Sequence, residues 1–461
     1  MDFPLFDKKT NNNLKKNRKT MNTFRKMIIT LFVACIGISV YAQQTDSLKY
    51  ERISIHSQTT VIDQYKPAFR VPYSGQNSLL PQAENQTSIT STLYLGLRLW
   101  QGGSVYINPE LAGGSGLSQV LGIADATNGE TPRIADPAPG ISIARLFYHQ
   151  VFALSSETTY QPSDFNQLSG RLPNNYLALT IGTISIGDYF DDNKYSHDPR
   201  TQFMTWSLMD AGAWDYPADT RGYTPSIVIE YVTPKNELRF GFSLMPKVAN
   251  GNNMNWDIAK ARAQTLEFTH RYKINGLDGA FRILGFFNTA NMGNYLQSIT
   301  LNPTAPNIES TRKYGNTKYG FAINAEQALT NDLGCFLRGS WNDGNNETWA
   351  FTEIDHSISI GLSLTGASWK RESDNIGLAY VTSGISKAHI EYLADGGYGF
   401  MLGDGKLNYG WEHLTELYYS AELVKNNIYL TGAYQFLLNP GYNRDRKGPV
   451  NIFSVRLHVR I

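Results

Sequence analysis

Alternation of apolar and polar residues is the feature of this sequence that most restricts its fold. The clearest example runs from Ile354 to Thr365, where apolar side chains at every second position, interrupted only by His356, oppose Asp, Ser, Gly and Thr between them. Successive side chains of a β-strand point to opposite faces, so this stretch predicts a strand with one apolar and one polar face. The same pattern occurs at 92–99 and 238–244.

Comparable stretches follow one another along the chain and bring the expected total to about sixteen strands. The others lie at 53–62, 104–111, 141–153, 176–186, 226–232, 262–274, 280–288, 318–329, 332–341, 374–392, 412–424, 427–438 and 450–461. The contrast between the two faces is weak at 141–153, which indicates a strand whose inner face is covered by loops. In 450–461 the alternation of apolar and polar residues continues to the last residue, which suits a strand that closes a barrel.

The connections between these stretches alternate in length. Short turn-like sequences separate some neighbours, at 233–236, 275–276, 330–332 and 425–427. Longer stretches rich in Gly, Asn, Asp and aromatic residues separate others, at 113–140, 187–225, 246–261, 290–317 and 394–411. Short turns at one end and long loops at the other predict an antiparallel barrel, with one or more long loops folded into its lumen.

Composition favours a transmembrane barrel over a soluble sheet protein. Beyond the N-terminal region no segment has the ~18 to 20 consecutive apolar residues of a membrane-spanning helix, and no helical period of useful length is found. Only 18% of the residues are charged, and 12% are aromatic. A β-sandwich, the main alternative, would leave strand edges to protect, which a closed barrel does not. The predicted fold class is therefore all-β, a transmembrane antiparallel β-barrel, and the net charge of +1 argues against a nucleic-acid partner.

The N-terminus predicts export. Arg25 and Lys26 precede an apolar run from 27 to 40 that ends in the small-residue sequence Val40-Tyr41-Ala42. This order is typical of a secretory signal peptide, so cleavage is expected after Ala42, with residues 43–461 as the mature domain and residues 1–20 as an over-extended start. A lipoprotein anchored through Cys35 is the alternative. Removal of Cys35 would leave Cys335 alone, without a disulfide or a thiol-metal site.

Sequence patterns typical of enzymes are absent. No nucleophile elbow, zinc-protease motif, phosphate-binding loop or dinucleotide-binding glycine pattern is found. The groups of residues most similar to a catalytic site are His56-Ser57, Ser196-His197-Asp198 and Glu412-His413. None of them has a recognisable mechanistic spacing. The acidic run 188–193 could bind calcium, but a solvated loop is the simpler interpretation. We therefore expect a channel without catalysis, metal or cofactor.

Charged residues of both signs are expected to face the lumen. They are Arg98, Glu230, Arg239, Glu267, Arg271, Arg282, Glu326, Arg338, Glu416, Glu422, Arg456 and Arg460. Mixed Arg and Glu groups can hydrogen-bond neutral hydroxyls without strong selection for charge, or they can pair across strands and stiffen the wall. Tryptophans at 206, 214, 341 and 349 lie in or near polar loops, where the apolar face of a sugar could stack on them.

Several segments spread across the chain resemble the carbohydrate-selective porin family of the OprB type. They are Gln58–Val61, Asn108–Gly114, Tyr195–Phe203, Trp214–Ala218, Ser340–Gly344 and Glu391–Phe400. The resemblance implies a sixteen-stranded barrel in the outer membrane of a Gram-negative bacterium. Its infolded loops would make a constriction that passes monosaccharides, and also short oligosaccharides, by facilitated diffusion. Carried over by position, the residues of the constriction or its scaffold are Glu110, Arg145, Asp198, Arg200, Trp214, Asp343 and Glu353.

Other functions remain open at this point. A general non-selective porin would share the fold, and a barrel-anchored adhesin would place its binding function in the external loops. A channel for hydrophobic solutes would need an apolar N-terminal plug, and an active transporter would need a plug domain and an energy-coupling segment, neither of which is found. The expected partners are sugars, outer-membrane lipid and lipopolysaccharide, and the barrel assembly machinery, with the protein a monomer or a homotrimer.

Overall fold

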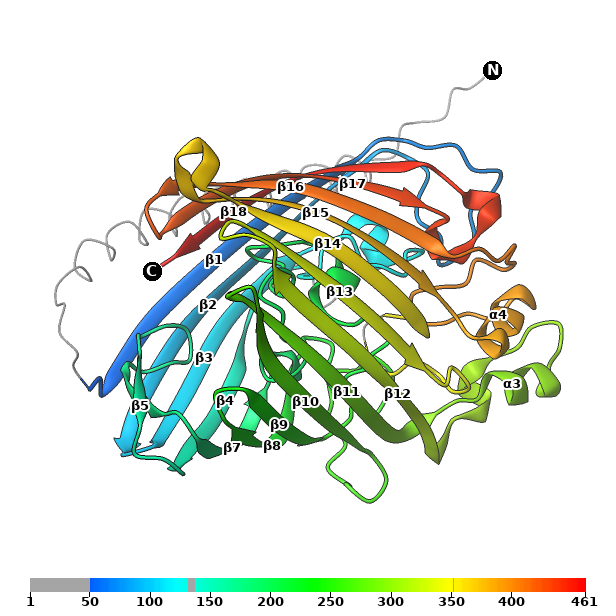
Figure 1. Cartoon of the computed structure of the whole chain (residues 1–461). Helices are drawn as coiled ribbons and strands as arrows, with labels where there is room; N and C mark the ends of the chain where they lie inside the picture. The colour runs from blue at the N-terminus through cyan, green and yellow to red at the C-terminus, as the bar shows by residue number, and fades with distance from the viewer. Residues whose placement is uncertain (1–49, 132–136, 351) are drawn as a thin grey trace, which may run out of the picture. The chain divides into compact units, whose positions relative to one another are not determined.

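The computed structural model describes residues 50–131, 137–350 and 352–461, and these are built around a closed ring of antiparallel strands (Figure 1). The ring contains sixteen strands: β1 (Ile53–Lys66), β2 (Glu84–Trp100), β3 (Gly103–Gly114), β4 (Gly140–Ala153), β7 (Tyr176–Ile184), β8 (Thr224–Val232), β9 (Asn236–Ser243), β10 (Arg262–Ile274), β11 (Leu277–Met292), β12 (Lys313–Ala328), β13 (Leu333–Asn342), β14 (His356–Gly366), β15 (Arg371–Gly384), β16 (Glu412–Val424), β17 (Ile428–Leu438) and β18 (Val450–Arg460). The predicted fold class is confirmed. The predicted signal peptide, 1–42, lies outside the described residues.

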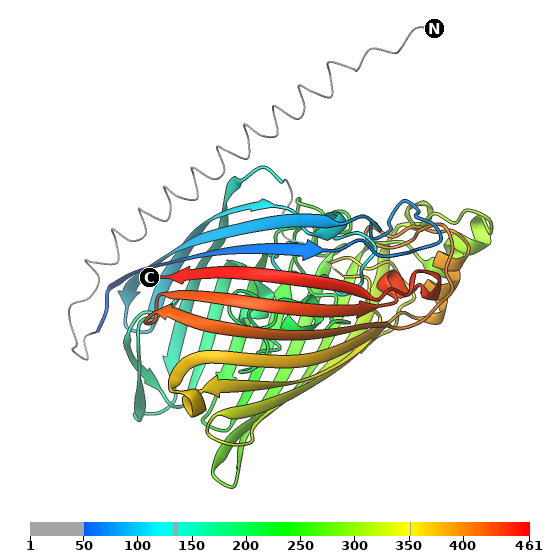
Figure 2. The same cartoon turned by 90° about the horizontal axis from the view of Figure 1, so that it is seen from above.

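The ring closes between the first and last strands. β1 pairs antiparallel with β18, with Thr59 opposite Val459 and Asp63 opposite Val455. Figure 2 shows the two strands side by side, β1 in blue and β18 in red. Because every strand of the ring has a partner on both sides, the ring has no open edge that could pair with another molecule.

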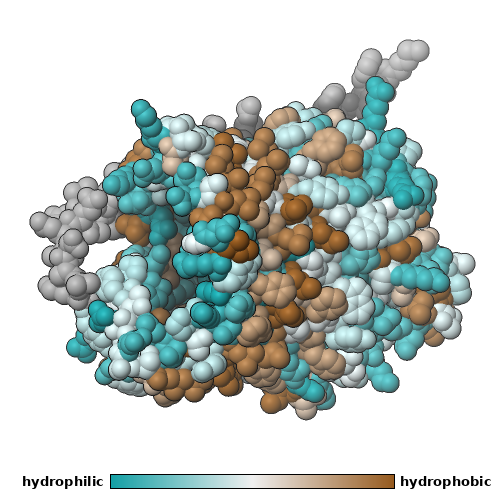
Figure 3. All heavy atoms as spheres, viewed as in Figure 1, coloured by the Kyte–Doolittle hydropathy of each residue, from teal (hydrophilic) through white to brown (hydrophobic). Residues whose placement is uncertain are grey.

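The two faces of each strand are as different as the alternation predicts. On β14, Ile358 and Ile360 are more than half exposed on the outer face, whereas Ser357 and Ser359 are buried on the inner face. Figure 3 shows apolar residues gathered in a band across the middle of the strands, with polar residues toward both ends. An apolar belt of this kind matches the hydrocarbon layer of a membrane. Among the described residues, no helix is long and apolar enough to cross a membrane.

Connections at the two ends of the barrel differ in length. At one end, here called the turn end, short turns such as Asn275–Gly276 join the strands, and both of these residues have positive φ, as a tight hairpin requires. A longer segment at this end, residues 154–175, contains the hairpin β5 (Thr158–Gln161) and β6 (Gly170–Pro173). At the opposite end, here called the loop end, long loops connect the strands and include the helices α3 (Tyr295–Leu301) and α4 (Lys387–Ala394), as Figure 1 shows.

One sequence-based expectation was wrong. Strand structure was expected over the whole of 374–392, but β15 ends at Gly384 and α4 follows, begun by Ser386, whose hydroxyl accepts from the backbone N–H of His389 at 3.1 Å. The sequence from 387 to 392 alternates polar and apolar residues, so a short helix and a strand have the same pattern there. The sequence shows no helical period of useful length, and the described α-helices have four to eight residues. Besides α2 (Trp206–Met209), α3 and α4, 3₁₀ turns occur at Leu117–Val120, Ile186–Asp188, Ile308–Thr311, Ala367–Trp369, Pro440–Tyr442 and Arg444–Arg446.

Two loops fold into the lumen, as predicted. They are here called L2, residues 115–139, of which 132–136 are not described, and L3, residues 185–223. The Glu416 carboxylate on β16 accepts from the backbone N–H groups of Met204 and Thr205 in L3, at 2.7 and 3.0 Å. Gln435 on β17 donates to the Thr127 carbonyl of L2 at 2.8 Å. Inward-facing polar side chains of the wall therefore satisfy the backbone groups of the loops, which have no ladder partners of their own.

Candidate functional site

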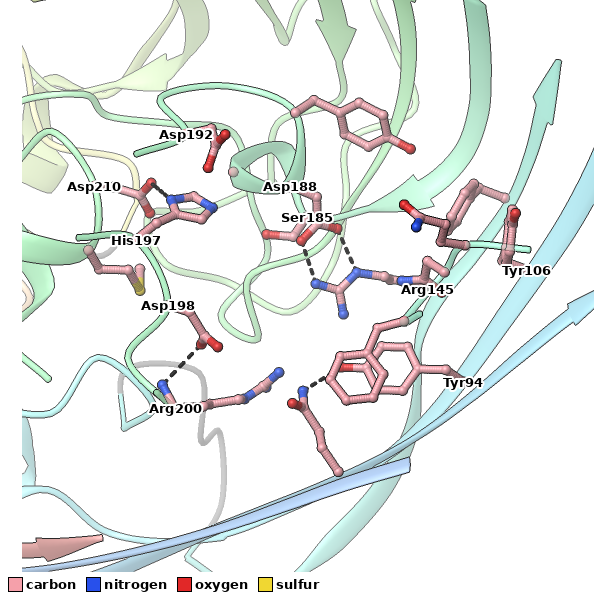
Figure 4. Close-up of a pocket in the computed structure, with 18 of the residues that line it drawn as sticks. Tyr94, Tyr106, Arg145, Ser185, Asp188, Asp192, His197, Asp198, Arg200 and Asp210 are labelled. Atoms are coloured by element: carbon pink, nitrogen blue, oxygen red, sulfur yellow. Dashed lines mark hydrogen bonds and ion pairs between the residues drawn. The ribbon is translucent and has the colours of Figure 1, made fainter. Parts of the chain in front are cut away.

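A cavity of about 600 Å³ lies inside the barrel, between the inner wall of β1–β4, β8 and β9 and the loop L3. Arg145 on β4 and Asp198 and Arg200 on L3 line it, together with Tyr94 on β2 and Tyr106 on β3. Figure 4 shows the guanidinium groups of Arg145 and Arg200 on opposite sides of a shared space. The structure thus brings together three of the seven predicted site residues.

Arg145 is held by a two-point ion pair. Its Nε and Nη2 atoms each lie 2.6 Å from a carboxylate oxygen of Asp188, which follows β7 at the start of L3. The guanidinium group also lies over the ring of Tyr223, 5.2 Å from its centroid. Two parallel hydrogen bonds fix the plane as well as the position of a guanidinium group, so Arg145 presents a constant surface to the cavity.

Arg200 is held by two buried carboxylates. Its Nε lies 2.9 Å from Glu130 of L2, and its Nη2 lies 3.3 Å from Glu110 of β3. Glu110 also accepts hydrogen bonds from the hydroxyls of Thr92, at 2.7 Å, and Tyr223, at 2.8 Å. Glu110 therefore lies behind Arg200 and supports it. This contact ties L2, L3 and the wall together at one point.

Asp198 stands at a turn of L3. One carboxylate oxygen accepts from the backbone N–H of Arg200 at 3.0 Å, and the other from the hydroxyl of Thr201 at 3.1 Å. An aspartate that bonds the backbone two residues on stabilises its own turn. The turn places the carboxylate of Asp198 and the guanidinium of Arg200 in the wall of the same cavity.

Carboxylates outnumber guanidinium groups around the cavity. The acidic residues in its lining are Glu130, Asp188, Asp192, Asp198, Asp210 and Glu230, and the arginines are Arg145, Arg200 and Arg239. Glu230 and Arg239 pair across β8 and β9 at 2.9 Å. The cavity therefore has mixed charge with an acidic excess, and such an excess favours cations and neutral solutes over anions.

His197 adds a titratable group to the lining. It lies 3.8 Å from Asp210. Burial lowers the pKa of His197, but Asp210 and Asp192 raise it by more, so the net shift is upward from its ordinary value. The positive charge of His197 is thus present at higher pH than that of a solvated histidine, which partly offsets the acidic excess as the pH falls.

Aromatic rings form part of the cavity wall. Tyr106 stacks on Phe147, with ring centroids 5.0 Å apart, and Tyr216 of L3 also reaches the lining. Phe147 belongs to an apolar cluster with residues of L3, including Ile186 and Trp206. The weak polarity contrast of the segment 141–153 therefore has its physical reason here, because loops cover the inner face of β4.

The remaining predicted site residues lie away from this cavity. Trp214 is buried in the loop core, with its ring centroid 5.2 Å from that of Tyr216. Glu353 is buried at the loop end, where its carboxylate accepts from the backbone N–H of Leu402 at 2.7 Å. Asp343 follows β13 and accepts from the backbone N–H of Tyr319 at 3.1 Å. Contacts of this kind hold loops in place. That the three residues belong to a constriction remains a prediction.

The tryptophans proposed for sugar stacking are placed elsewhere. Trp206 and Trp349 are buried in the protein core, and Trp341 is exposed on β13. The cavity instead uses Tyr94 and Tyr106, whose positions on the inner faces of β2 and β3 follow from the alternation of those strands. Sequence reasoning missed them because tyrosines of a barrel belong by default to its interfacial girdles.

The acidic run 188–193 faces arginines. Asp188 pairs with Arg145, and Asp191 lies 3.2 Å from Arg338. Asp192 lies 3.7 Å from Arg282. Within the described ranges, no group of three or more His, Cys, Asp or Glu side chains is arranged to hold a metal ion. The run serves to attach L3 to the wall at several points.

Comparison with known proteins decides the family. Residues 76–460 match the family described as carbohydrate-selective porin, OprB family. This chain belongs to that family. The porin is therefore a channel of the bacterial outer membrane, and the short connections of such barrels face the periplasm. No match was found among curated proteins.

A solved structure shares the fold of the porin. Pseudomonas putida OprB, in its high-pH structure, superposes with a TM-score of 0.65 at 15% identity, covering 89% of this chain and 94% of that one. The outer membrane channel DcaP of Acinetobacter baumannii has a TM-score of 0.49 at 10% identity, covering 89% of this chain and 97% of that one. At 15% identity the likeness to the Pseudomonas putida structure extends to the fold alone.

Proposed function

We propose that this porin mediates facilitated diffusion of sugars across the outer membrane, chiefly monosaccharides and also short oligosaccharides. The observation that carries the proposal is the cavity between L3 and the wall, where Arg145, Arg200 and neighbouring carboxylates lie beside aromatic rings. Planar charged groups bond the hydroxyls of a sugar, and aromatic faces cover its apolar side. The volume of about 600 Å³ falls within the range of about 300–1,000 Å³ typical of small-molecule sites.

The charge of the cavity refines the substrate class. Neutral sugars meet no net penalty from the acidic excess, amino sugars are favoured by it, and uronic acids are opposed by it. We therefore expect glucose and glucosamine to enter faster than glucuronate. Facilitated diffusion requires no cofactor and no coupling to the inner membrane, and catalysis is not part of the proposal.

The proposal also covers the partners of the porin. Its apolar belt would contact outer-membrane lipid and lipopolysaccharide, and its insertion would use the barrel assembly machinery. A monomer and a homotrimer are both compatible with a lumen that is complete within one chain. The predicted pore-lining or scaffold roles of Trp214, Asp343 and Glu353 stay part of this proposal.

Liposome swelling tests the function. Residues 43–461 are refolded into liposomes, and entry rates are compared for glucose, a disaccharide, an amino acid and a salt of similar size. Faster entry of glucose than of the equally small solutes supports a sugar-preferring pore. Entry ordered by size alone would make the protein a general porin, and no entry would favour an adhesin role of the external loops.

A further inference from the structure

The connection between β4 and β7, residues 154–175, differs from the other connections that the structure describes at the turn end. Those others are short turns, such as 101–102 and 425–427, whereas this segment contains the hairpin β5–β6. Figure 1 shows β5 near the start of β1, at the end of the barrel opposite α3 and α4. A long connection at the end where barrels have short turns requires its own explanation.

The middle of this segment contacts the inner wall of the barrel. Asn108 of β3 donates to the side-chain oxygen of Asn166 at 2.8 Å. Phe165 stacks on Tyr94 of β2, with ring centroids 4.4 Å apart and an angle of 16° between the planes. Leu168 is buried in the apolar cluster that also contains residues of L3. The segment therefore folds into the mouth of the barrel at the turn end.

Residues at both edges of the barrel seam hold the segment in place. The backbone N–H of Ser169 donates to the carboxylate of Glu51, just before β1, at 2.7 Å. Arg460, the last residue of β18, lies 2.7 Å from Asp164, and its guanidinium group lies over the ring of Phe165, 4.7 Å from the centroid. Contacts from β18 and from the residue Glu51 just before β1 keep the segment against the wall.

The segment lines the same cavity as L3. Gln161, Phe165, Asn166 and Gln167 contribute to its wall, together with Arg145 and the L3 residues described above. The cavity is thus enclosed by L3 on one side and by this segment on the periplasmic side.

We propose that residues 161–167 form a second constriction of the pore, which acts in series with L3 and selects solutes as they leave the cavity toward the periplasm. Phe165 narrows the exit, and the side-chain amides of Gln161 and Asn166 meet the hydroxyls of a passing sugar. This inference rests on the proposed function, because it names further specificity-determining residues for the same solutes.

Two variants test the constriction. In the first, residues 155–174 are replaced by Asn-Gly, so that β4 and β7 are joined by a short turn. In the second, Phe165→Ala and Asn166→Ala are combined in the full-length chain. Single-channel conductance in KCl is expected to rise roughly three-fold in the first and roughly two-fold in the second, because a wider and less obstructed path passes more ions. The ratio of disaccharide to glucose entry into liposomes is expected to rise in both.

Arg171→Ala is the matched control. Arg171 lies in β6 of the same segment, is exposed, and bonds Thr158 of β5 without lining the cavity. Its conductance and sugar order should equal those of the wild type. Folding of each variant is checked by heat-modifiable migration on gels. If the shortened chain does not fold, the double point variant decides the question.

The possible outcomes separate this inference from the proposed function. If the wild type shows no preference for glucose over non-sugars, the proposed function fails, whatever the variants do. If the wild type prefers glucose and the folded variants keep both its conductance and its ratio of disaccharide to glucose entry, the second constriction is overturned.

Discussion

Along β13–β18 the inner wall is packed against L2 and L3, whereas along β1–β4, β8 and β9 part of the wall faces a cavity. In the packed half, Arg338, Glu416 and Arg456 reach from the wall to backbone groups of L3, as in the 2.8 Å contact from Arg338 to the Leu208 carbonyl. In the cavity half, Glu230 and Arg239 pair with each other across their strands. Wall residues that bond a loop fix it in place, as Arg145 and Glu110 also do at the edge of the cavity, whereas wall residues that pair with each other leave room for solute.

Removing a wall contact in the packed half should have the largest effect on stability. Arg338→Ala would leave Asp191 buried without its ion-pair partner, which typically costs about 3–5 kcal/mol. A lower midpoint of urea unfolding and a higher, noisier conductance are expected, because L3 loses an attachment. Arg271→Ala is the control: Arg271 is 42% exposed and its partner Glu237 keeps an ion pair with Arg239, so the loss should cost at most about 1 kcal/mol. Equal midpoints for the two variants would contradict the packed-half interpretation.

A substitution in the cavity half should change selectivity more than stability. The side chain of Asp192 is 56% exposed and lines the cavity. Asp192→Asn is expected to move the reversal potential in a KCl gradient toward anions and to change the free energy of unfolding by no more than about 0.5 kcal/mol. Asp63→Asn, on the outer face of β1 opposite the exposed Val455, should leave the reversal potential unchanged. The interpretation fails if both variants shift it equally.

The smallest expected effect is a pH dependence of ion selectivity. Because the pKa of His197 is raised by Asp210 and Asp192, its positive charge, with any stability it adds, is present below that pKa and lost as the pH rises through it. Cation preference should therefore decline as the pH falls from about 8 toward about 6.5, the ordinary pKa of histidine. The decline should begin at a higher pH than it would for a solvated histidine. His197→Gln should remove this decline. An unchanged pH profile in the variant would exclude His197 as the titrating group.

The fold could be predicted almost entirely from the sequence, and the site only in part. Period-two alternation located all sixteen strands of the ring, because one face of each meets hydrocarbon and the other does not. It could not distinguish α4 from the end of β15, since six residues fit both patterns. It also gave no sign of the infolded segment 154–175, whose short strands carry no clear alternation.

The path of the loops accounts for the rest of the site. Arg145 is on a strand, so its inward direction follows from alternation, whereas Asp198, Arg200 and Trp214 all belong to L3. Two of those three reach the cavity and Trp214 packs into the loop core, an outcome set by tertiary contacts such as the one between Arg200 and Glu130. No local pattern encodes contacts between residues so far apart in the chain.

Cysteine accessibility tests the contrast between the two halves most directly. In a Cys335→Ser background, Ser185→Cys places a thiol in the cavity lining, and Ser359→Cys places one on the buried inner face of β14. Single-channel conductance is recorded before and after addition of a water-soluble methanethiosulfonate. The structure predicts that conductance falls for Ser185→Cys and stays constant for Ser359→Cys. A constant conductance for Ser185→Cys with a fall for Ser359→Cys would place the solute path in the other half and contradict the account.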